Sequence, residues 1–294
     1  MTLRSRAVVA TVVSLSAVAV LGAYFGGRAL EGKHPLPRPG CTVQGSDRTT
    51  AAGAPRRVTL EPDQMANAAT IAATGVRRKV PERAIVVALA TAYQESELVN
   101  VAGGDRDSIG LFQQRPSQGW GTPEELRDPR YAANRFYAAL GKVKGWERLR
   151  VTDAAQAVQR SAYPEAYQKW ADEAQVLADA LMGISPGAVA CLGDTEPPVR
   201  GTVAEAALLA NLTLDWGNLE ARPPAGRPGL ALPAADDQAG WRYAHWLVSH
   251  AGQHGVQRVR YAGRQWTAQA GNWSPAPDRT PGGKLVVAEV FAAD

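Results

Sequence analysis

The apolar positions of the chain begin with one long uncharged run near its start. The segment AVVATVVSLSAVAVLGAYF covers residues 7–25, after a short basic stretch at residues 1–6. Its length matches the roughly 17–25 residues of a membrane-spanning helix better than the roughly 7–15 of a signal-peptide core. No small-residue cleavage site follows it cleanly, so the pattern favours an uncleaved transmembrane anchor at residues 7–27, with residues 1–6 as a cytoplasmic N-terminus. Basic residues on both sides of the run leave its orientation open.

Helical periodicity dominates the next part of the chain. Residues 28–57 are rich in Gly, Pro, Thr and Arg without an apolar period, which predicts a linker. Residues 58–192 have the pattern of a succession of helices. The most apolar of these helices, at residues 82–98, follows Pro81 and is apolar nearly all round, so we expect it to be buried.

The last hundred or so residues have a different pattern. Residues 193–229 predict a linker that contains one short helix at residues 202–216. A further helix and alternating strands indicate a small α/β domain over residues 230–294. Its strands are expected at residues 256–261, 264–267 and 284–291. The expected fold class is therefore a mainly α domain plus a small α/β C-terminal domain, preceded by one N-terminal transmembrane helix.

Composition and charge exclude several classes of protein. The chain has 294 residues, of which 45% are hydrophobic and 20% charged, so it can bury a core and is not globally disordered. Its 32 basic residues are dispersed among 28 acidic ones, whereas nucleic-acid-binding proteins cluster them, so no nucleic-acid partner is expected. A single spanning segment also makes a transporter or channel a poor interpretation.

The two cysteines, Cys41 and Cys191, bracket the helical region. In an oxidising compartment an isolated pair predicts one disulfide, which would tie the linker back across that region. Two separate thiols remain the alternative, because spacing alone does not exclude them.

The residues with the clearest chemistry lie at the end of the apolar helix. Residues 93–98 read Tyr-Gln-Glu-Ser-Glu-Leu, and residues 110–114 read Gly-Leu-Phe-Gln-Gln. This arrangement resembles the lytic transglycosylases and goose-type lysozymes of the lysozyme-like superfamily, in which a buried helix ends in Glu-Ser and Gly-Leu-Met-Gln follows about fifteen residues later. Here Glu95 precedes Gly110 by fifteen residues, and phenylalanine replaces the methionine. The resemblance covers about residues 62–182 and implies a lysozyme-like helical domain.

The resemblance implies that Glu95 is the catalytic residue. Cleavage of a glycosidic bond needs a carboxylic acid that still holds its proton near neutral pH, and the end of an apolar helix that faces a cleft can supply one. In the family this one Glu protonates the leaving oxygen and then acts as a base, while the N-acetyl group of the substrate assists and an anhydro sugar forms. Helical periodicity does not choose between Glu95 and Glu97; the resemblance chooses Glu95. No metal ion or other cofactor is expected.

Four further residues are assigned to substrate binding: Gln113, Ser96, Tyr163 and Gln159. Gln113 matches the family's Gln and either binds substrate or fixes its loop, while Ser96 supports the neighbouring glutamate rather than acting as a nucleophile. The family's Tyr-Asn pair near the end of the domain is replaced here by Gln-Arg at residues 159–160. Tyr163 then either fills the role of the family's tyrosine or simply packs.

Two aspartates precede Gly110, and they are candidates for a second carboxylate of the hydrolytic type. Asp105 and Asp107 lie in a Gly-rich loop, where Asp more often caps backbone N–H groups. We therefore favour the capping interpretation.

The tail resembles, in degenerate form, a domain common on actinobacterial cell-wall proteins, in which a helix precedes a strand and the last strand carries several histidines. Here His245, His250 and His254 all lie on the predicted helix and no histidine follows them, so no zinc site is expected. The tryptophans of the tail form a core or a platform for wall sugars, and a core is the commoner use of buried aromatic residues.

These observations together predict a membrane-anchored, extracytoplasmic enzyme that cleaves the glycan strand of peptidoglycan, as a lytic transglycosylase or a muramidase. The expected location is the cell membrane, with a single pass and the bulk of the chain outside. The alternative is a catalytically weak or inactive lysozyme-fold module that binds the cell wall or a wall-remodelling partner. Glu95 favours the enzyme, and the altered Tyr-Asn pair favours the binding module.

Overall fold

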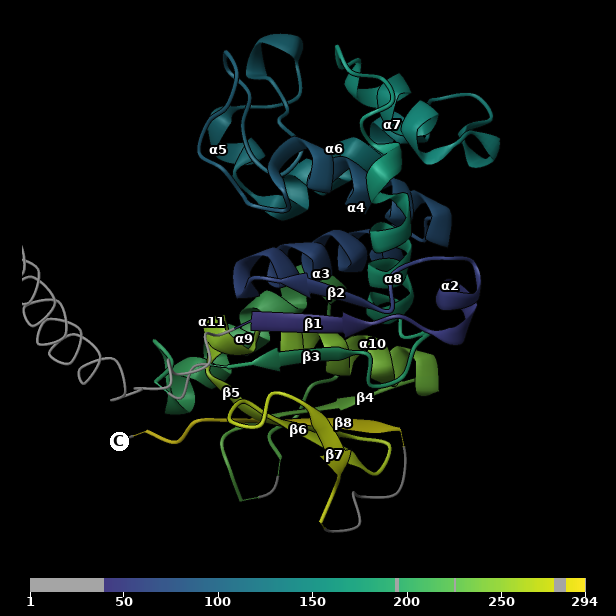
Figure 1. Ribbon diagram of the computed structural model, residues 1–294. Coiled ribbons are helices and arrows are strands. Elements are labelled where there is room, and N and C mark those ends of the chain that lie inside the picture. Colours follow the sequence, from purple (N-terminus) through teal and green to yellow (C-terminus); the bar gives the residue numbers. More distant parts are fainter. Residues whose placement is uncertain (1–39, 194–195, 225, 278–283, 294) are drawn as a thin grey trace, which may run out of the picture. The chain divides into compact units, whose positions relative to one another are not determined.

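The computed structural model describes residues 40–193, 196–224, 226–277 and 284–293 (Figure 1). The anchor predicted at residues 7–27 lies outside these residues. Among the residues described, no helix is both long and apolar enough to cross a membrane. The chain from Pro39 onward forms one compact unit, and its architecture is described below.

A group of packed helices carries the N-terminal half of the unit. Its centre is α4 (Glu82–Ser96), in which every residue from Ala84 to Tyr93 is buried. Gly75 of α3 (Pro62–Arg77) lets three helices meet closely, because a Cβ there would lie 2.7 Å from the side chain of Ile85 and 2.8 Å from the hydroxyl of Tyr137. The other helices around α4 are α5 (Pro123–Leu126), α6 (Pro129–Leu140), α7 (Val151–Gln159), α8 (Ala171–Leu181) and the short 3-10 turns η1 (Pro116–Gln118), η2 (Trp146–Arg148) and η3 (Gln168–Trp170).

A three-stranded antiparallel sheet underlies these helices. Its order is β2-β1-β3, with β1 (Gly40–Gln44) in the centre, β2 (Arg57–Leu60) on one edge and β3 (Val189–Leu192) on the other. The short helix α2 (Asp47–Ala51) joins β1 to β2. Figure 1 shows these strands just below α3; α10 packs against β3, and α8 packs against β1 and β2.

The C-terminal part forms a second antiparallel sheet, of five strands in the order β4-β8-β5-β6-β7. Its helix α10 (Asp237–Ser249) packs against β5 and β8, and Trp241 contacts Tyr261 edge-on with ring centroids 5.3 Å apart. Alternation along β5 places Val259 and Tyr261 in this core. The remaining elements are α9 (Gly201–Trp216), α11 (Ala251–His254), β4 (Gly229–Pro233), β5 (Val256–Tyr261), β6 (Arg264–Thr267), β7 (Trp273–Pro275) and β8 (Leu285–Val290).

The expected fold class, a mainly α domain with a separate small α/β domain after a transmembrane helix, is wrong. The described chain contains two antiparallel sheets, of three and five strands, and no spanning helix. Part of the predicted linker at residues 28–57 instead forms β1 and α2. The strands of the first sheet are only four or five residues long, and β1 pairs with a strand 150 residues away, so no local apolar pattern marks them.

The predicted disulfide between Cys41 and Cys191 is confirmed. The two residues lie directly opposite each other in the β1–β3 ladder, with Cα atoms 4.0 Å apart, and both side chains are buried. The bridge therefore joins the start of the described chain to the end of the helical region, across 150 residues.

A buried carboxylate joins four helices at the centre of the unit. The side chain of Asp215, near the end of α9, has no exposed surface and forms an ion pair with Arg130 of α6. It also accepts hydrogen bonds from the indole N–H of Trp246, at 2.6 Å, and from the hydroxyl of Thr70, at 3.2 Å. Because α3, α6 and α10 each supply a donor, the charge is compensated only when all three are in place.

The three tail histidines are packing residues. His245 lies with Nδ1 2.7 Å from the carbonyl oxygen of Ala180, and the ring of His250 stacks on Trp246 with centroids 4.2 Å apart. His254 in turn stacks on His250. Burial lowers the pKa of His245 and of His254 to about 4, and that of His250 below its usual value. Within the described ranges, no three His, Cys, Asp or Glu side chains gather as metal ligands would.

Replacing both Cys41 and Cys191 by alanine should lower the free energy of unfolding by at most about 5 kcal/mol, the chain-entropy value for a loop of this length. Urea unfolding of the oxidised wild type, the reduced wild type and the double variant measures the effect. The reduced wild type and the variant should agree. Equal stability of all three would contradict a stabilising bridge.

Acid should destabilise the folded protein over a defined window. The folded-state pKa values of the tail histidines lie below the unfolded value of about 6.5, so their neutral forms stabilise the fold fully above that pH. This contribution is lost as the pH falls from about 6.5 to about 4. Urea midpoints measured across this range should fall, and the fall should be smaller in His245→Gln. A midpoint that does not change with pH would refute the assignment.

Candidate functional site

The end of α4 presents Glu95 at the wall of a cavity. The helix stops after Ser96 because Glu97 and Leu98 both adopt left-handed conformations, with φ of 53° and 61°. Such a conformation costs a non-glycine residue roughly 1–2 kcal/mol. Burial of the Leu98 side chain, worth about 1.5–3 kcal/mol, offsets part of this strain.

Two amides from α3 hold this turn in place. Gln64 donates to the carbonyl oxygen of Glu97 at 2.7 Å, and Asn67 donates to that of Leu98 at 2.8 Å. The last carbonyl groups of a helix have no partner within the helix, and these two side chains supply hydrogen-bond donors to the carbonyl groups at the end of α4. The position of Glu95 is therefore fixed by the packing of α3 against α4.

The cavity beside Glu95 has a volume of about 490 Å³ and brings together four of the five predicted site residues. They come from three segments: Glu95 from the end of α4, Gln113 from the turn after Gly110, and Gln159 and Tyr163 from the end of α7 and the loop after it. Ser96, the fifth, does not line it. Other residues lining the cavity are Asp105, Arg106, Ser108, Gln114, Arg115, Gln118, Trp120, Arg160, Ser161 and Ala162.

The carboxylate of Glu95 has one hydrogen-bond donor within the described chain. The hydroxyl of Tyr167 donates to its Oε1 at 2.6 Å, and the Tyr167 side chain is fully buried. Burial, and then the nearby Glu95 carboxylate, raise the pKa of Tyr167, so the hydroxyl stays protonated and acts as a donor. Among the described residues, Oε2 of Glu95 has no hydrogen-bond partner and remains available to a ligand.

Sequence analysis assigned Tyr163 to substrate binding and did not identify Tyr167. Tyr163 lies on the rim of the cavity with 74% of its surface exposed, and its side chain makes no hydrogen bond to another described residue. Both tyrosines occur in one short segment four residues apart. No spacing signal separates them, because their burial is decided by how η3 packs against α4.

The Gly-Leu-Phe-Gln-Gln segment forms a tight turn against α4. The Ser96 hydroxyl lies 2.9 Å from the carbonyl oxygen of Leu111, and the Gln159 amide donates to that of Phe112 at 2.7 Å. Gly110 has φ of +74°, and a Cβ there would lie 2.4 Å from a backbone oxygen, so only glycine fits. Ser96 therefore fixes the turn, while Gln159 fixes it and also lines the cavity.

The two glutamines of this turn differ in role. Gln113 has φ of 45°, and its amide donates back to the Gly110 carbonyl oxygen at 3.1 Å, so it closes its own turn at the cavity wall. Gln114 is buried, and its amide donates to the carbonyl oxygen of Ala132 on α6 at 3.1 Å. The sequence pointed to Gln113 through the family motif but gave no signal for Gln114.

Asp107 is a capping residue. Its carboxylate accepts from the Ser117 backbone N–H at 2.8 Å and from Arg115 Nε at 2.6 Å. The backbone hydrogen bond and then the Arg115 hydrogen bond hold the pKa of Asp107 well below its usual value. Asp105 is almost fully exposed at the cavity rim. Glu95 is therefore the carboxylate of this cavity that is both partly buried and hydrogen-bonded to the helix core.

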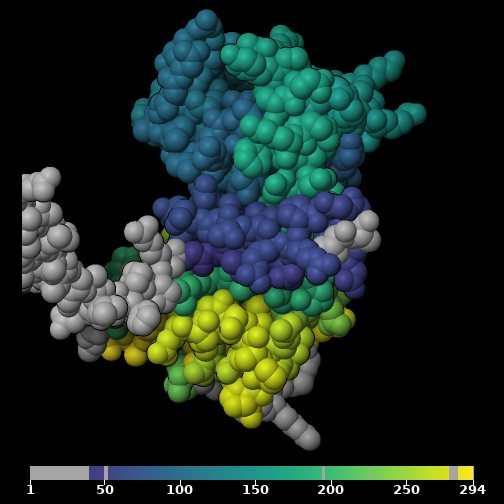
Figure 2. Space-filling model, in the orientation of Figure 1, coloured from purple at the N-terminus to yellow at the C-terminus, as the bar shows by residue number. Residues whose placement is uncertain are grey.

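A second cavity of about 640 Å³ continues from the first. The two share the residues Gln118, Trp120, Gln159 and Arg160 as lining, and the second adds the basic side chains of Arg135 and Lys142. Figure 2 shows a hollow at the top of the molecule, between the blue lobe around residues 100–125 and the teal lobe around residues 150–165. The site is therefore an elongated groove with a positively charged side.

Glu97, the other carboxylate of the motif, belongs to a different cavity. It is exposed and lies with Tyr93 and Trp170 on the opposite side of the helix end. The structure thus places the two glutamates of the motif in different cavities.

Comparisons with models of protein families and with curated protein sequences find no match for this chain. The arguments below therefore depend on the geometry of the site and on the resemblance of its motif.

Replacing Asp107 by asparagine should loosen the loop from residue 105 to 118, because the amide keeps the size of the carboxylate but loses the charge that holds Arg115. We expect faster hydrogen exchange at the Ser117 amide, measured by mass spectrometry or NMR. Asp105→Asn is the matched control and should leave that rate unchanged. Unchanged exchange in Asp107→Asn would show that the loop is held by other contacts.

Proposed function

We propose that this protein cleaves the glycan strand of peptidoglycan, with Glu95 as the proton donor. The observation that carries the proposal is the setting of Glu95. Its carboxylate is half-buried at the end of a buried helix, is held on one oxygen by Tyr167, and opens with the other onto a groove. Among the groups that line the groove, it is best placed to transfer a proton to a bound ligand.

The proposed reaction needs one carboxyl group. Protonated Glu95 gives its proton to the oxygen that joins two sugars, and the bond from the anomeric carbon to that oxygen breaks. The N-acetyl oxygen of the sugar assists at the anomeric carbon. The carboxylate then removes a proton from the sugar's own hydroxyl, which closes an anhydro ring, or from a water molecule, which completes hydrolysis. Tyr167 keeps the carboxylate in position through both steps.

The lining of the groove suits an anionic glycan. Arg135, Lys142 and Arg160 can pair with the carboxylates that peptidoglycan carries on its lactyl and peptide groups. Trp120, partly buried where the two cavities meet, offers an apolar surface on which a sugar ring can lie. The groove thus combines attraction for charge with a surface for a sugar.

The proposed location is outside the membrane, with the chain tethered by its N-terminal apolar run. The Cys41–Cys191 disulfide supports this, since such bridges persist in oxidising compartments. The proposed tether lies outside the described residues.

Binding without cleavage is the second candidate function, and one observation favours it. Gln159, at the place of the family's Tyr-Asn pair, uses its amide to hold the Phe112 carbonyl oxygen rather than leaving it for substrate. A groove arranged in this way could hold a glycan strand without reacting with it.

Glu95→Gln should lower the cleavage of purified cell walls by at least about 100-fold, because the amide keeps the shape but cannot donate the proton. Glu97→Gln is the matched control and should retain most activity, since it faces the other cavity. Zymography and mass analysis of the released muropeptides measure both variants. Equal activity of wild type and Glu95→Gln would contradict the proposal that the protein is an enzyme with Glu95 as its proton donor.

The same variants and purified cell walls distinguish the two candidate functions. Sedimentation with insoluble cell walls should show that Glu95→Gln still binds. A wild type that binds but releases no muropeptide would select the binding module instead.

A further inference from the structure

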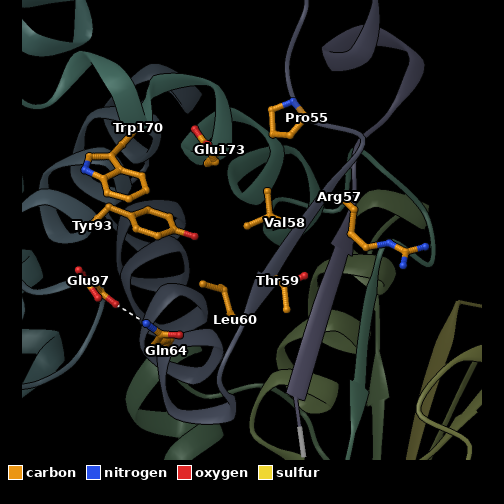
Figure 3. A pocket seen from close by; sticks show the side chains of 10 residues that line it. All are labelled: Pro55, Arg57, Val58, Thr59, Leu60, Gln64, Tyr93, Glu97, Trp170 and Glu173. Atoms are coloured by element: carbon orange, nitrogen blue, oxygen red, sulfur yellow. Dashed lines mark hydrogen bonds between the residues drawn. The ribbon is translucent and has the colours of Figure 1, made fainter.

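A cavity on the far side of the α4 end runs along an open strand edge. It has a volume of about 380 Å³ and is lined by four consecutive residues of β2, from Arg57 to Leu60. Successive residues of a strand point to opposite faces, so a cavity that touches all four must follow the edge of the strand. In the described sheet, β2 has β1 as its one partner, and its other edge faces this cavity (Figure 3).

The ladder shows which backbone groups the edge offers. The N–H of Gly45 bonds to the carbonyl oxygen of Arg56, so Arg56 directs its backbone groups toward β1. Every second residue of the strand does the same, so Val58 and Leu60 also direct their N–H and C=O groups toward β1. Arg57 and Thr59 therefore direct N–H and C=O outward. Neither residue forms a backbone hydrogen bond with the rest of the described chain beyond its own strand pairing.

The hydroxyl of Tyr93 points into the same cavity. Its side chain is 7% exposed and stacks on Trp170, with centroids 4.7 Å apart and ring planes 9° apart. Figure 3 shows the hydroxyl directed toward Val58 and Leu60, and no hydrogen bond joins it to a described residue. Burial, and then the charge of Glu173, raise the pKa of Tyr93, so the group stays protonated. The ring of Tyr93 is thus buried while its hydroxyl opens into the cavity, where it can bond to a ligand.

The side chains that line the cavity carry a net negative charge. Glu97 and Glu173 line it, and its one basic lining residue, Arg57, points away from Tyr93 in Figure 3. A residue placed on an added strand opposite Val58 would share the face of Val58, and its side chain would enter the space in front of Tyr93. A basic side chain there would meet acceptors and no competing cation.

We propose that β2 binds an extended peptide segment of a partner protein, which adds to the sheet as a fourth, antiparallel strand. Its backbone pairs with the outward groups of Arg57 and Thr59, and a Lys or Arg opposite Val58 fills the cavity beside Tyr93, Glu97 and Glu173. This site is separate from the groove at Glu95, so the proposal does not depend on the proposed glycan cleavage.

The test uses a fluorescent, end-capped peptide, Thr-Val-Lys-Val-Thr, and the full-length protein. Fluorescence anisotropy should show saturable binding, and hydrogen exchange measured by NMR should slow at the amides of Arg57 and Thr59. The amides of Val58 and Leu60, already bonded to β1, should not change. The same peptide with Glu in place of Lys should bind at least about tenfold more weakly.

Variants separate the backbone from the side-chain contribution. Thr59→Pro removes the outward N–H at an edge position that tolerates proline, and should weaken binding at least about tenfold, while Thr59→Ala should not. Tyr93→Phe, which removes only the hydroxyl, should weaken it about two- to tenfold. Should Thr59→Pro misfold, the exchange rates of the wild type and the Tyr93→Phe affinity still decide the matter.

Several results would overturn the proposal. Absence of peptide binding, or binding without protection of Arg57 and Thr59, would exclude strand addition. If N-acetyl-lysine amide bound as tightly as the peptide, the cavity would be a site for a small amine rather than for a strand. Protection of the two amides that rises with protein concentration alone would identify a second copy of the chain as the occupant.

Discussion

The carboxylate of Asp215 is the constraint on which the arrangement of the unit depends. A charge without exposed surface is tolerated only when hydrogen-bond donors and an opposite charge surround it, and removing one partner of a buried pair typically costs about 3–5 kcal/mol. Here Thr70, Arg130 and Trp246 come from three helices far apart in sequence. Helices α3, α6 and α10 must therefore meet α9 in one relative position. Apolar packing alone would permit small shifts among them, whereas the directional bonds do not.

This constraint reaches the groove through α6 and α3. On α6, Phe136 stacks on Phe112 with centroids 4.8 Å apart, and the Ala132 carbonyl oxygen binds Gln114, so the turn that forms the groove wall is tied to the helix that carries Arg130. On α3, Gln64 and Asn67 hold the end of α4, one or two turns before Thr70. The turn at residues 110–114 and the end of α4, which form part of the groove wall, are thus each anchored to a helix that bonds to Asp215. The proposed proton transfer by Glu95 would need this kind of fixed geometry.

The sequence allowed prediction of features that are local or chemically distinctive. The buried helix α4 follows from an apolar run that starts after a proline, and the cysteine pair was recognisable because no other cysteine competes with it. The residues around Glu95 followed from a spaced motif. The β1–β3 pairing did not follow from any pattern, since its partners are 150 residues apart, and neither did the bond of Tyr167 to Glu95 or the buried Asp215. Each of these depends on tertiary packing, which a linear pattern does not encode.

The end of α4 also explains why one cavity holds Glu95 and a different one holds Tyr93. Residues two apart on a helix project about 200° from each other, so Tyr93 and Glu95 necessarily face opposite sides. The left-handed pair Glu97 and Leu98 then turns the chain away before either side is covered. A glycine in this turn would relieve the strain but would also let the turn move. Two non-glycine residues stand there instead, and the side chain of one of them, Leu98, is fully buried. Two connections join the sides: this turn, which α3 holds through two side-chain amides, and the segment in which Tyr167 bonds Glu95 while Trp170 stacks on Tyr93.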